Sequence, residues 1–224
     1  MSTHPSLSTV PPSPSPAPRP ARGAVVRHLP IGDSAEALVK ALRDGHPHAA
    51  ATLYDRYAAH VRRVLARTLG VDHELDDALQ DSFVQALRGV ARLEEPRRLQ
   101  AWLTSVAVFT ARGLIRRRAR RRWLALSSPE RLAEREAPMA SSEDREALRA
   151  TYAILDTLKA DDRIAFALRT IDGMTLEEVA AACGCSLATA KRRIKRAEQR
   201  FVARARRHPT LAAWLETGDR WRTR

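Results

Sequence analysis

The segment from Thr175 to Ala197, TLEEVAAACGCSLATAKRRIKRA, constrains the fold more than any other part of the chain. Thr175 and Glu178 have the spacing of a capping box, so we expect a helix to begin directly after Thr175. Gly184 lies where that helix must end, because glycine enters the left-handed conformation at little cost. Ser186 is placed to cap a second helix. The pattern therefore predicts two short helices joined by a tight turn.

The second of these helices has an apolar face and a cationic face. Its apolar residues repeat at three- and four-residue spacing and are Leu187, Ala190, Ile194, Ala197 and Phe201. Its cations lie off that stripe and are Lys191, Arg192, Arg193, Lys195 and Arg196. A helix-turn-helix with such a second helix is suited to the major groove, so the segment predicts DNA binding.

The charge of the whole chain also favours a polyanionic partner. The 224 residues carry a formal net charge of +13, and the arginines are clustered rather than scattered. Clustered cations raise the affinity for nucleic acid by displacing phosphate counterions, so we favour this interpretation over a plain solvated surface. No apolar run reaches the roughly 18 to 20 residues that span a bilayer, and no secretory signal is visible. We therefore expect a cytoplasmic protein without membrane insertion.

No motif gathers the residue types of a catalytic or metal centre. Cys183 and Cys185 are the two cysteines, too few for a structural zinc site, and we interpret them as small packing residues. A DNA-processing enzyme would need an activated nucleophile or a carboxylate cluster, whereas Tyr54, Tyr57 and Tyr152 fall on apolar helix faces. We therefore expect a protein that is not an enzyme and has no cofactor.

Composition divides the chain into two helical domains and three other segments. Eight of the thirteen prolines lie in the first 32 residues, a composition that cannot bury a core. Prolines and serines return between the two helical stretches without an apolar stripe. The predicted all-α order is a disordered arm (1–32), a first helical domain (33–125), a flexible linker (126–145), a helix-turn-helix domain (146–208) and a tail (209–224).

Caps and stops predict the helix boundaries inside these domains. Asp33 has capping-box spacing to Glu36, so we expect it to cap the first helix. Gly70 should end the second helix. In the second domain, Asp161 or Asp162 is expected to cap the helix that precedes Gly173. The tail beyond His208 carries Trp214 and Trp221, which are placed to dock on either domain or on a partner.

Seven arginines crowd the end of the helix that follows Pro96. They lie within eleven residues without an intervening acid and are Arg112, Arg116, Arg117, Arg118, Arg120, Arg121 and Arg122. Like charges this dense destabilise a helix by about a few tenths of a kcal/mol per close pair. The run therefore needs a counter-charge, and DNA phosphate is the natural one. The apolar residues around it, Leu114, Ile115, Trp123 and Leu124, disfavour a disordered basic tail.

The helix written DDALQDSFVQAL has an acidic outer face. Its outward residues are Asp77, Gln80, Asp81 and Val84. Its inward residues are Leu79, Phe83 and Leu87. Because carboxylates repel phosphate, this face is suited to a protein partner, although the pattern alone leaves a plain solvated face equally open.

Two stretches resemble the sigma-70 family, in its extracytoplasmic-function (ECF) type. Residues 154–201 resemble region 4 through Leu155, Leu158, Arg163, Gly173, Thr175, Glu178, Val179, Ala180, Gly184, Ser186, Thr189, Lys191, Arg193, Arg196 and Ala197. DDALQDSFVQAL is similar to the region-2 motif D-L-V-Q-E-x-F-L-x-A, and Trp102-Leu103 is similar to the W-L-x-x-I-A segment that follows it. The resemblance covers about residues 33–207 and implies a two-domain sigma factor.

The resemblance also implies partners and roles. The expected partners are bacterial core RNA polymerase, promoter DNA and, as a further candidate, an anti-sigma factor. The residues expected against the β′ clamp helices are Asp76, Asp77, Gln80 and Asp81. The candidates for −10 contacts are Trp102, Phe109, Arg112, Arg116 and Arg117. The candidates for the −35 major groove are Ser186, Thr189, Lys191, Arg192, Arg193, Lys195 and Arg196, with their domain resting on the β flap.

Departures from the family pattern leave the −10 preference open. Ser105, Val108-Phe109 and Gly113 stand where the family usually has Arg, Arg-Asn and Asp. For Phe109 we favour a core position over stacking on a base. Arg192 stands where a small polar residue is common. The alternative function is a free-standing helix-turn-helix regulator, usually a symmetric dimer, against which the region-2 resemblance argues.

Overall fold

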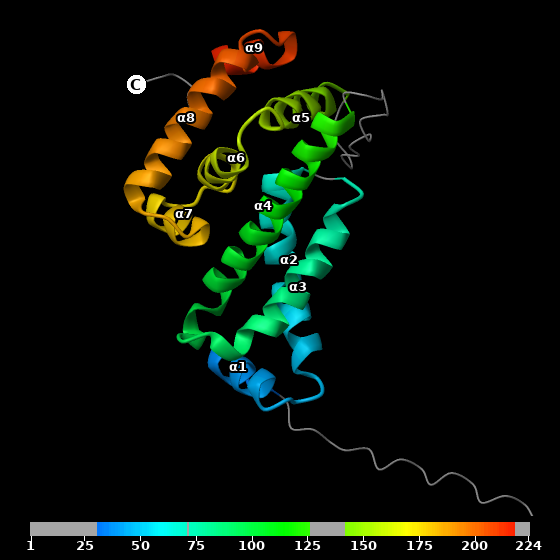
Figure 1. Ribbon diagram of the computed structural model, residues 1–224, viewed down its shortest axis with the longest axis vertical. Helices are drawn as coiled ribbons and strands as arrows, with labels where there is room; N and C mark the ends of the chain where they lie inside the picture. The colour runs from blue at the N-terminus through cyan, green and yellow to red at the C-terminus, as the bar shows by residue number, and fades with distance from the viewer. Residues whose placement is uncertain (1–30, 71, 126–141, 218–224) are drawn as a thin grey trace, which may run out of the picture. The chain divides into compact units, whose positions relative to one another are not determined.

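The computed structural model describes residues 31–70, 72–125 and 142–217, and every regular element in these ranges is helical (Figure 1). The α-helices are α1 (Ala35–Arg43), α2 (Ala49–Leu69), α3 (Leu75–Gly89), α4 (Leu99–Ala125), α5 (Ser142–Leu155), α6 (Ala160–Phe166), α7 (Leu176–Cys183), α8 (Leu187–Ala205) and α9 (Pro209–Thr217). The all-α prediction is confirmed. The arm up to residue 30, residues 126–141 of the predicted linker and residues 218–224 of the tail lie outside the described residues.

Helices α1 to α4 form a bundle in which α2, α3 and α4 pack on one another and α1 crosses one end (Figure 1). Two short 3-10 turns, η1 (Val90–Arg92) and η2 (Pro96–Arg98), connect α3 to α4 and lie against α1. Helix α2 ends at Gly70, as predicted, with φ 90°. The buried core side chains include Leu38, Leu53, Leu65, Leu79 and Leu103.

The predicted helix-turn-helix is present as α7 and α8. The Thr175 side chain accepts from the Glu178 backbone N–H, and the Glu178 carboxylate accepts from the Thr175 N–H, which completes the capping box. Gly184 has φ 62° and ψ 45°, the left-handed conformation expected of it. Ser186 caps α8 by accepting from the Thr189 N–H. Each of these four local predictions is confirmed.

Two other caps were predicted wrongly. The side chain that caps α1 is Ser34, whose Oγ accepts from the Ala37 N–H at 3.1 Å, whereas Asp33 pairs with Arg56. The N-cap of α6 is Lys159, without a side-chain cap, and Asp161 and Asp162 both lie in the first helical turn. At the start of α1 two acceptors, Asp33 and Ser34, are adjacent, and spacing alone does not show which of them caps the helix. At the start of α6 the carboxylates of Asp161 and Asp162 form long-range ion pairs instead of a cap.

A helix, α9, occupies residues 209–217, where the sequence predicts only a tail. It packs against α5, which begins at residue 142, four residues before the predicted domain start. Leu211 of α9 is buried, and Thr210 Oγ1 donates to Glu146 Oε1 at 3.2 Å. Trp221 and the side chain of Trp214 lie outside the described residues.

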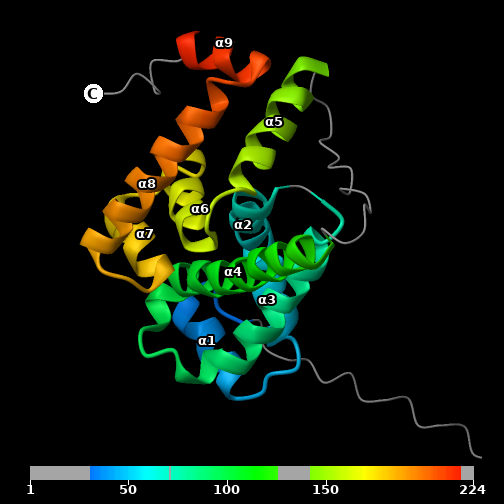
Figure 2. The ribbon, with the colours of Figure 1, turned by 45° about the horizontal axis from the view of Figure 1, so that its top comes forward.

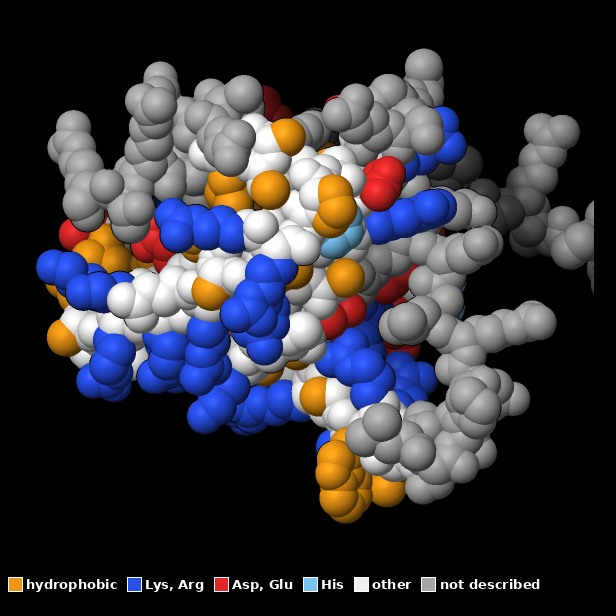
Figure 3. Space-filling view, turned by 90° about the horizontal axis from the view of Figure 1, so that it is seen from above, with side chains coloured by type: hydrophobic (Ala, Val, Ile, Leu, Met, Phe, Trp, Pro, Cys, Tyr) orange, Lys and Arg blue, Asp and Glu red, His pale blue; other side chains and the backbone are white. Residues whose placement is uncertain are grey.

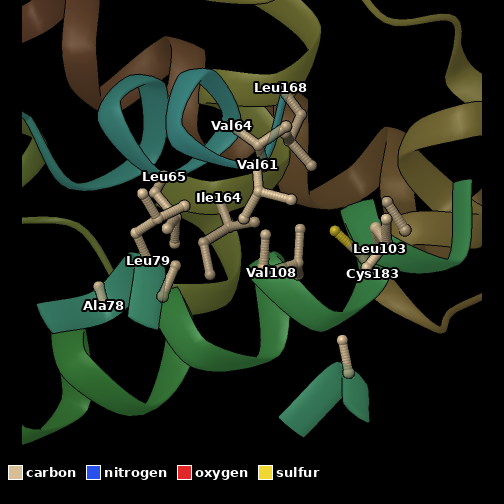
Figure 4. Packing of buried hydrophobic residues seen from close by; sticks show 14 of the residues in the cluster. Val61, Val64, Leu65, Ala78, Leu79, Leu103, Val108, Ile164, Leu168 and Cys183 are labelled. Atoms are coloured by element: carbon tan, nitrogen blue, oxygen red, sulfur yellow. The ribbon is translucent and has the colours of Figure 1, made fainter. Parts of the chain in front are cut away.

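Described helices from both predicted domains share one hydrophobic core within a single compact unit (Figure 4). The side chains that meet there include Val61 and Leu65 of α2, Leu79 of α3, Leu103 and Val108 of α4, and Ile164, Leu168 and Cys183 from the second half of the chain. Leu168 lies in a π-helical turn, η3 (Ala167–Ile171), that extends α6. The two halves are therefore packed together in this structure.

A buried arginine from the second half of the chain donates hydrogen bonds to the last carbonyl groups of α2. Arg163 is 1% exposed, and its guanidinium donates to the carbonyls of Thr68 at 2.8 Å and Leu69 at 2.9 Å. The Tyr152 hydroxyl donates to the carbonyl of Ala66 at 2.8 Å. The last carbonyls of a helix lack intrahelical partners, so these contacts stabilise α2 as well as joining the halves.

The arginine-rich end of α4 is held by acids before and at the start of α3. Arg118 is nearly buried and contacts Asp72 Oδ2 at 2.9 Å and Glu74 Oε2 at 2.6 Å. Arg121 contacts Glu74 Oε1 at 2.8 Å. Burial alone would raise the pKa of Glu74, but the hydrogen bond from Arg121 and the charge and hydrogen bond of Arg118 outweigh it, so the pKa is lowered.

Glu74→Gln should lower the free energy of unfolding at neutral pH by about 1–3 kcal/mol, because it removes charge-assisted hydrogen bonds. The folded pKa of Glu74 is below the unfolded one, so its contribution is present above the unfolded pKa and is lost as the pH falls through the folded value. Urea unfolding from about pH 7 to pH 3 should show the difference between wild type and variant shrinking. A difference independent of pH would contradict this role.

Gly184→Ala should destabilise the protein by about 1–2 kcal/mol, because a Cβ is unfavourable in the left-handed conformation. Gly113 provides the matched control, since it lies inside α4 and a Cβ there meets nothing within 4 Å. Gly113→Ala should stabilise by about 0.5–1 kcal/mol. Thermal or urea unfolding measures the stability of both variants. If Gly184→Ala and Gly113→Ala change the stability in the same direction, the left-handed turn at Gly184 is contradicted.

Candidate DNA and protein interfaces

The acidic face of α3, defined by Asp76, Asp77, Gln80 and Asp81, is exposed throughout. Asp76 pairs with Arg62 of α2, whereas Asp77 and Asp81 make no ion pair with any described residue. The structure therefore brings the four predicted residues together on one surface and leaves two carboxylates free for a partner.

Apolar side chains continue the acidic face along α3. Val84 is 40% exposed and Leu87 is 41% exposed, so the prediction that Leu87 points inward is wrong. Nearby, the ring of Tyr54 lies 4.9 Å from that of Phe83 and is itself partly exposed. Exposed apolar side chains beside carboxylates are a composition suited to a protein interface.

Three of the cations predicted to contact the −35 element are free on the outer face of α8. Lys191, Arg192 and Lys195 are exposed and make no ion pair with described residues. Leu187, predicted on the apolar stripe, is 47% exposed at the first position of the helix, because the core covers the stripe only from Ala190 onward. The beginning of α8 therefore offers cationic and apolar side chains to a ligand.

The remaining predicted −35 residues have hydrogen-bond or ion-pair partners within their own domain. Arg196 Nε donates to Asp162 Oδ2 at 2.7 Å, and this hydrogen bond raises the pKa of Arg196. Arg193 is half-buried, with its guanidinium 3.7 Å from Asp161. Thr189 and Ser186 are bonded to each other through their hydroxyls at 3.0 Å. The predicted set thus divides into three cations without an ion pair and four residues with partners in their own domain.

The predicted −10 residues lie along α4 in different environments. Phe109 is 63% exposed, so the core position favoured from sequence is wrong. Trp102 is half-buried and packs close to Gly89. Arg112 contacts Asp161 at 2.8 Å, Arg116 contacts the same carboxylate at 3.3 Å, and Arg117 contacts Glu74 at 3.5 Å. These side chains follow one helix, but only Phe109 projects freely.

Intramolecular carboxylates supply counter-charge to the arginine run, for which the sequence suggested DNA phosphate. Asp72, Glu74, Asp156 and Asp161 together pair with six of its seven arginines. Arg120 makes no ion pair with a described residue. Sequence reasoning missed these acids because they lie far from their partners along the chain. The one available signal was the acidic segment DTLKADD beginning at Asp156, which complements the run in charge.

The cysteines behave as packing residues. Cys183 is buried, and burial first, then the neighbouring Cys185, raise the pKa of its thiol to about 11. Its backbone carbonyl accepts from Arg112 at 3.1 Å. Neither cysteine forms a disulfide, and the described residues contain no group of three metal-ligating side chains.

Lysine and arginine side chains gather along one edge of the face seen in Figure 3, with few acidic side chains between them. Such a continuous cationic edge is the electrostatic footprint expected of a nucleic-acid-binding surface. None of the described helices is both long and apolar enough to cross a membrane.

Comparison with family models matches both halves of the chain. Residues 53–121 match "Sigma-70 region 2", and residues 148–201 match "Sigma-70, region 4". The first match contains the acidic face of α3 and most of α4, and the second contains α6, α7 and nearly all of α8. Together the two matches cover more than half of the chain.

Similar proteins are ECF sigma factors. The chain is 29% identical over 163 residues to the ECF RNA polymerase sigma factor SigE of Mycolicibacterium smegmatis, which aligns 72% of this chain with 63% of that protein. It is 27% identical over 182 residues to the ECF RNA polymerase sigma-E factor of Salmonella typhimurium, with 73% and 90% covered. The chain thus spans less than two thirds of the first relative and most of the second.

Solved structures share the fold. CnrH in complex with the cytosolic domain of CnrY matches with a TM-score of 0.53 and 26% identity, over 76% of this chain and 96% of that chain. The sigma factor RpoE of Bartonella quintana, in complex with the anti-sigma factor NepR, matches with a TM-score of 0.53 and 24% identity, over 70% and 96%. Sigma factors are non-enzymatic transcription initiation factors. The chain belongs to the sigma-70 family, and the curated relatives that it resembles are sigma factors of the ECF type.

Proposed function

We propose that this protein binds bacterial core RNA polymerase and directs initiation at promoters that carry −10 and −35 elements. The observation that carries this proposal is the pairing, in one chain, of a free acidic-apolar face on α3 with a cationic recognition helix, α8. The first lies in the region-2 match and the second in the region-4 match. A free-standing regulator would need only the second.

The acidic face of α3 is the proposed contact with the β′ clamp helices. Free carboxylates at Asp77 and Asp81 provide charge complementarity and steer association with a basic partner. Exposed Val84 and Leu87 add apolar area that becomes buried in a complex. The domain that contains α8 is proposed to rest on the β flap, as the resemblance implies.

The outer face of α8 is the proposed reader of the −35 element. The first residues of a recognition helix contact base edges, and arginine or lysine pairs with guanine in the major groove. We assign direct contacts to Lys191, Arg192 and Lys195, which are exposed. For Arg193 and Arg196 the proposed role requires their ion pairs with α6 to open or to be shared with phosphate.

Helix α4 is the proposed contact with the −10 element. The exposed ring of Phe109 suits it to stack on an unpaired base, an interaction of about 1–3 kcal/mol. Trp102, Arg112, Arg116 and Arg117 lie along the same helix and supply the remaining proposed contacts. Strand separation then draws on binding energy, with cations on the displaced backbone.

The proposed domain limits follow these roles: region 2 over residues 33–125, a linker over 126–145 and region 4 over 146–208. The proposed site of action is the cytoplasm. Because one similar solved sigma factor is bound to an anti-sigma factor, a protein of that class is also a candidate partner here.

Asp77→Ala combined with Asp81→Ala should weaken binding to core polymerase by about ten- to a hundredfold, because it removes the free carboxylates of the proposed clamp contact. Affinity for isolated DNA should differ little from that of a charge-matched control. Asp33→Ala with Asp44→Ala removes the same charge from exposed positions beside α1. Titration by fluorescence anisotropy measures both affinities. If the two double variants lose the same amount of affinity for polymerase, the acidic face of α3 is not the polymerase contact.

Lys191→Ala combined with Arg192→Ala should reduce transcription from a −35-dependent promoter by about tenfold or more. Arg206→Ala with Arg207→Ala removes the same charge from exposed positions beyond α8 and should have a smaller effect. Transcription in vitro is compared on templates with an intact and a scrambled −35 element. If the α8 variant is equally impaired on both templates, its residues do not read that element.

A further inference from the structure

The side of α8 that points away from its neighbouring helices begins with two apolar side chains. Helices α5, α6 and α7 pack along the other side, where Ala190, Ala197 and Phe201 are buried (Figure 2). In the first turn of α8, Leu187 is 47% exposed and Ala188 is exposed as well. The surface proposed to read the −35 element is therefore apolar in its first turn, and its free cations follow in the next turns.

Helical periodicity aligns these apolar side chains with the free cations. Residues three or four positions apart lie on the same face of a helix. Lys191 follows Leu187 by four positions, whereas Arg192 and Lys195 follow the next residue, Ala188, by four and seven. We call these five residues the α8 column. The column starts with apolar side chains and continues with cations.

From the α8 column we infer that Leu187 and Ala188 read a thymine in the −35 element by contacting its 5-methyl group, next to a guanine read by Lys191. The inference rests on the proposed function, which places the outer face of α8 in the major groove. There, thymine is the base that presents a methyl group, and guanine presents two acceptors that suit lysine or arginine. One face of the helix thus carries side chains suited to both bases.

The two apolar side chains suit thymine better than any other part of DNA. Leucine and alanine side chains have no donor or acceptor, so they cannot bond to phosphate or to the polar edges of guanine, adenine and cytosine. Packing Leu187 over such an edge would strip water from polar groups without replacing their hydrogen bonds. Packing it on a methyl group buries apolar area on both partners. The Ala188 side chain is itself one methyl group, so the helix can approach the base closely.

Hydrogen bonds within the first turn of α8 occupy its polar side chains. Ser186 Oγ accepts from the Thr189 N–H at 3.3 Å, and the two hydroxyls are bonded at 3.0 Å. The side chains of this turn that remain available to a base are therefore those of Leu187 and Ala188. Because the same bonds fix the backbone, a contact made from it costs little ordering on binding, which favours discrimination by a single methyl group.

The test selects duplex DNA from a pool that carries a fully randomised segment, first with the free full-length chain and then with its complex with core polymerase. The wild type should enrich a thymine next to a guanine. Leu187→Ala should lower the preference for that thymine by about three- to fivefold, because a methyl contact is lost, and should keep the preference for guanine. Lys191→Ala should do the reverse. Leu148→Ala, at an exposed position of α5, is the matched control and should change neither preference.

A base analogue isolates the methyl group. Uracil differs from thymine only in lacking it, so a selected duplex with uracil at that position should bind the wild type about three- to fivefold more weakly. For Leu187→Ala the two duplexes should differ by less than about twofold. Unchanged affinity of the wild type would overturn the inference. An equal loss in the wild type and in Leu187→Ala would assign the effect to DNA shape and would also overturn it.

The selection also separates this inference from the proposed function. Thymine-dependent selection by the free chain, together with failure to bind polymerase, would support the base assignment and contradict the polymerase assignment. Selection by the polymerase complex of sequences without a preferred thymine would have the opposite meaning. If Leu187→Ala weakens polymerase binding and leaves the base preferences unchanged, Leu187 contacts a protein and the inference is overturned.

Discussion

The pairing of the α4 arginines with carboxylates is the interaction on which the rest of the structure depends. Seven arginines within eleven residues would repel one another in an isolated helix. Glu74 holds the end of α4 against the start of α3, while Asp156 and Asp161 hold it against the second half of the chain. The same ion pairs therefore neutralise the helix and join the two halves, so the stability of α4 and the packing of the halves have a common cause.

That constraint determines which surfaces remain free. The acidic face of α3 points away from the shared core, and the cations at the start of α8 point away from α6. Among the proposed −10 residues of α4, Phe109 is exposed, whereas Arg112, Arg116 and Arg117 are held in ion pairs. The chain therefore exposes its proposed polymerase contact, whereas most of its proposed −10 residues are engaged by other parts of the chain.

Local features could be predicted from the sequence and distant ones could not. The capping box at Thr175, the left-handed Gly184 and the Ser186 cap depend on residues within four positions of one another, and all were predicted correctly. The Asp33 cap was wrong because Ser34 is an adjacent acceptor of equal suitability. The pairing of Arg116 with Asp161 joins residues 45 positions apart, which helical periodicity does not report. The exposure of Phe109 and Leu87 likewise depends on which neighbouring helix covers them.

The most direct test of the central claim is size-exclusion chromatography of the full-length protein with bacterial core RNA polymerase, without DNA. The salt concentration should be about 0.3 M, at which loose contacts between exposed charges are largely screened. Co-elution is the predicted result, because the acidic-apolar face of α3 is exposed in the free protein. Separate elution, with DNA binding intact, would contradict the account and favour a free-standing helix-turn-helix regulator.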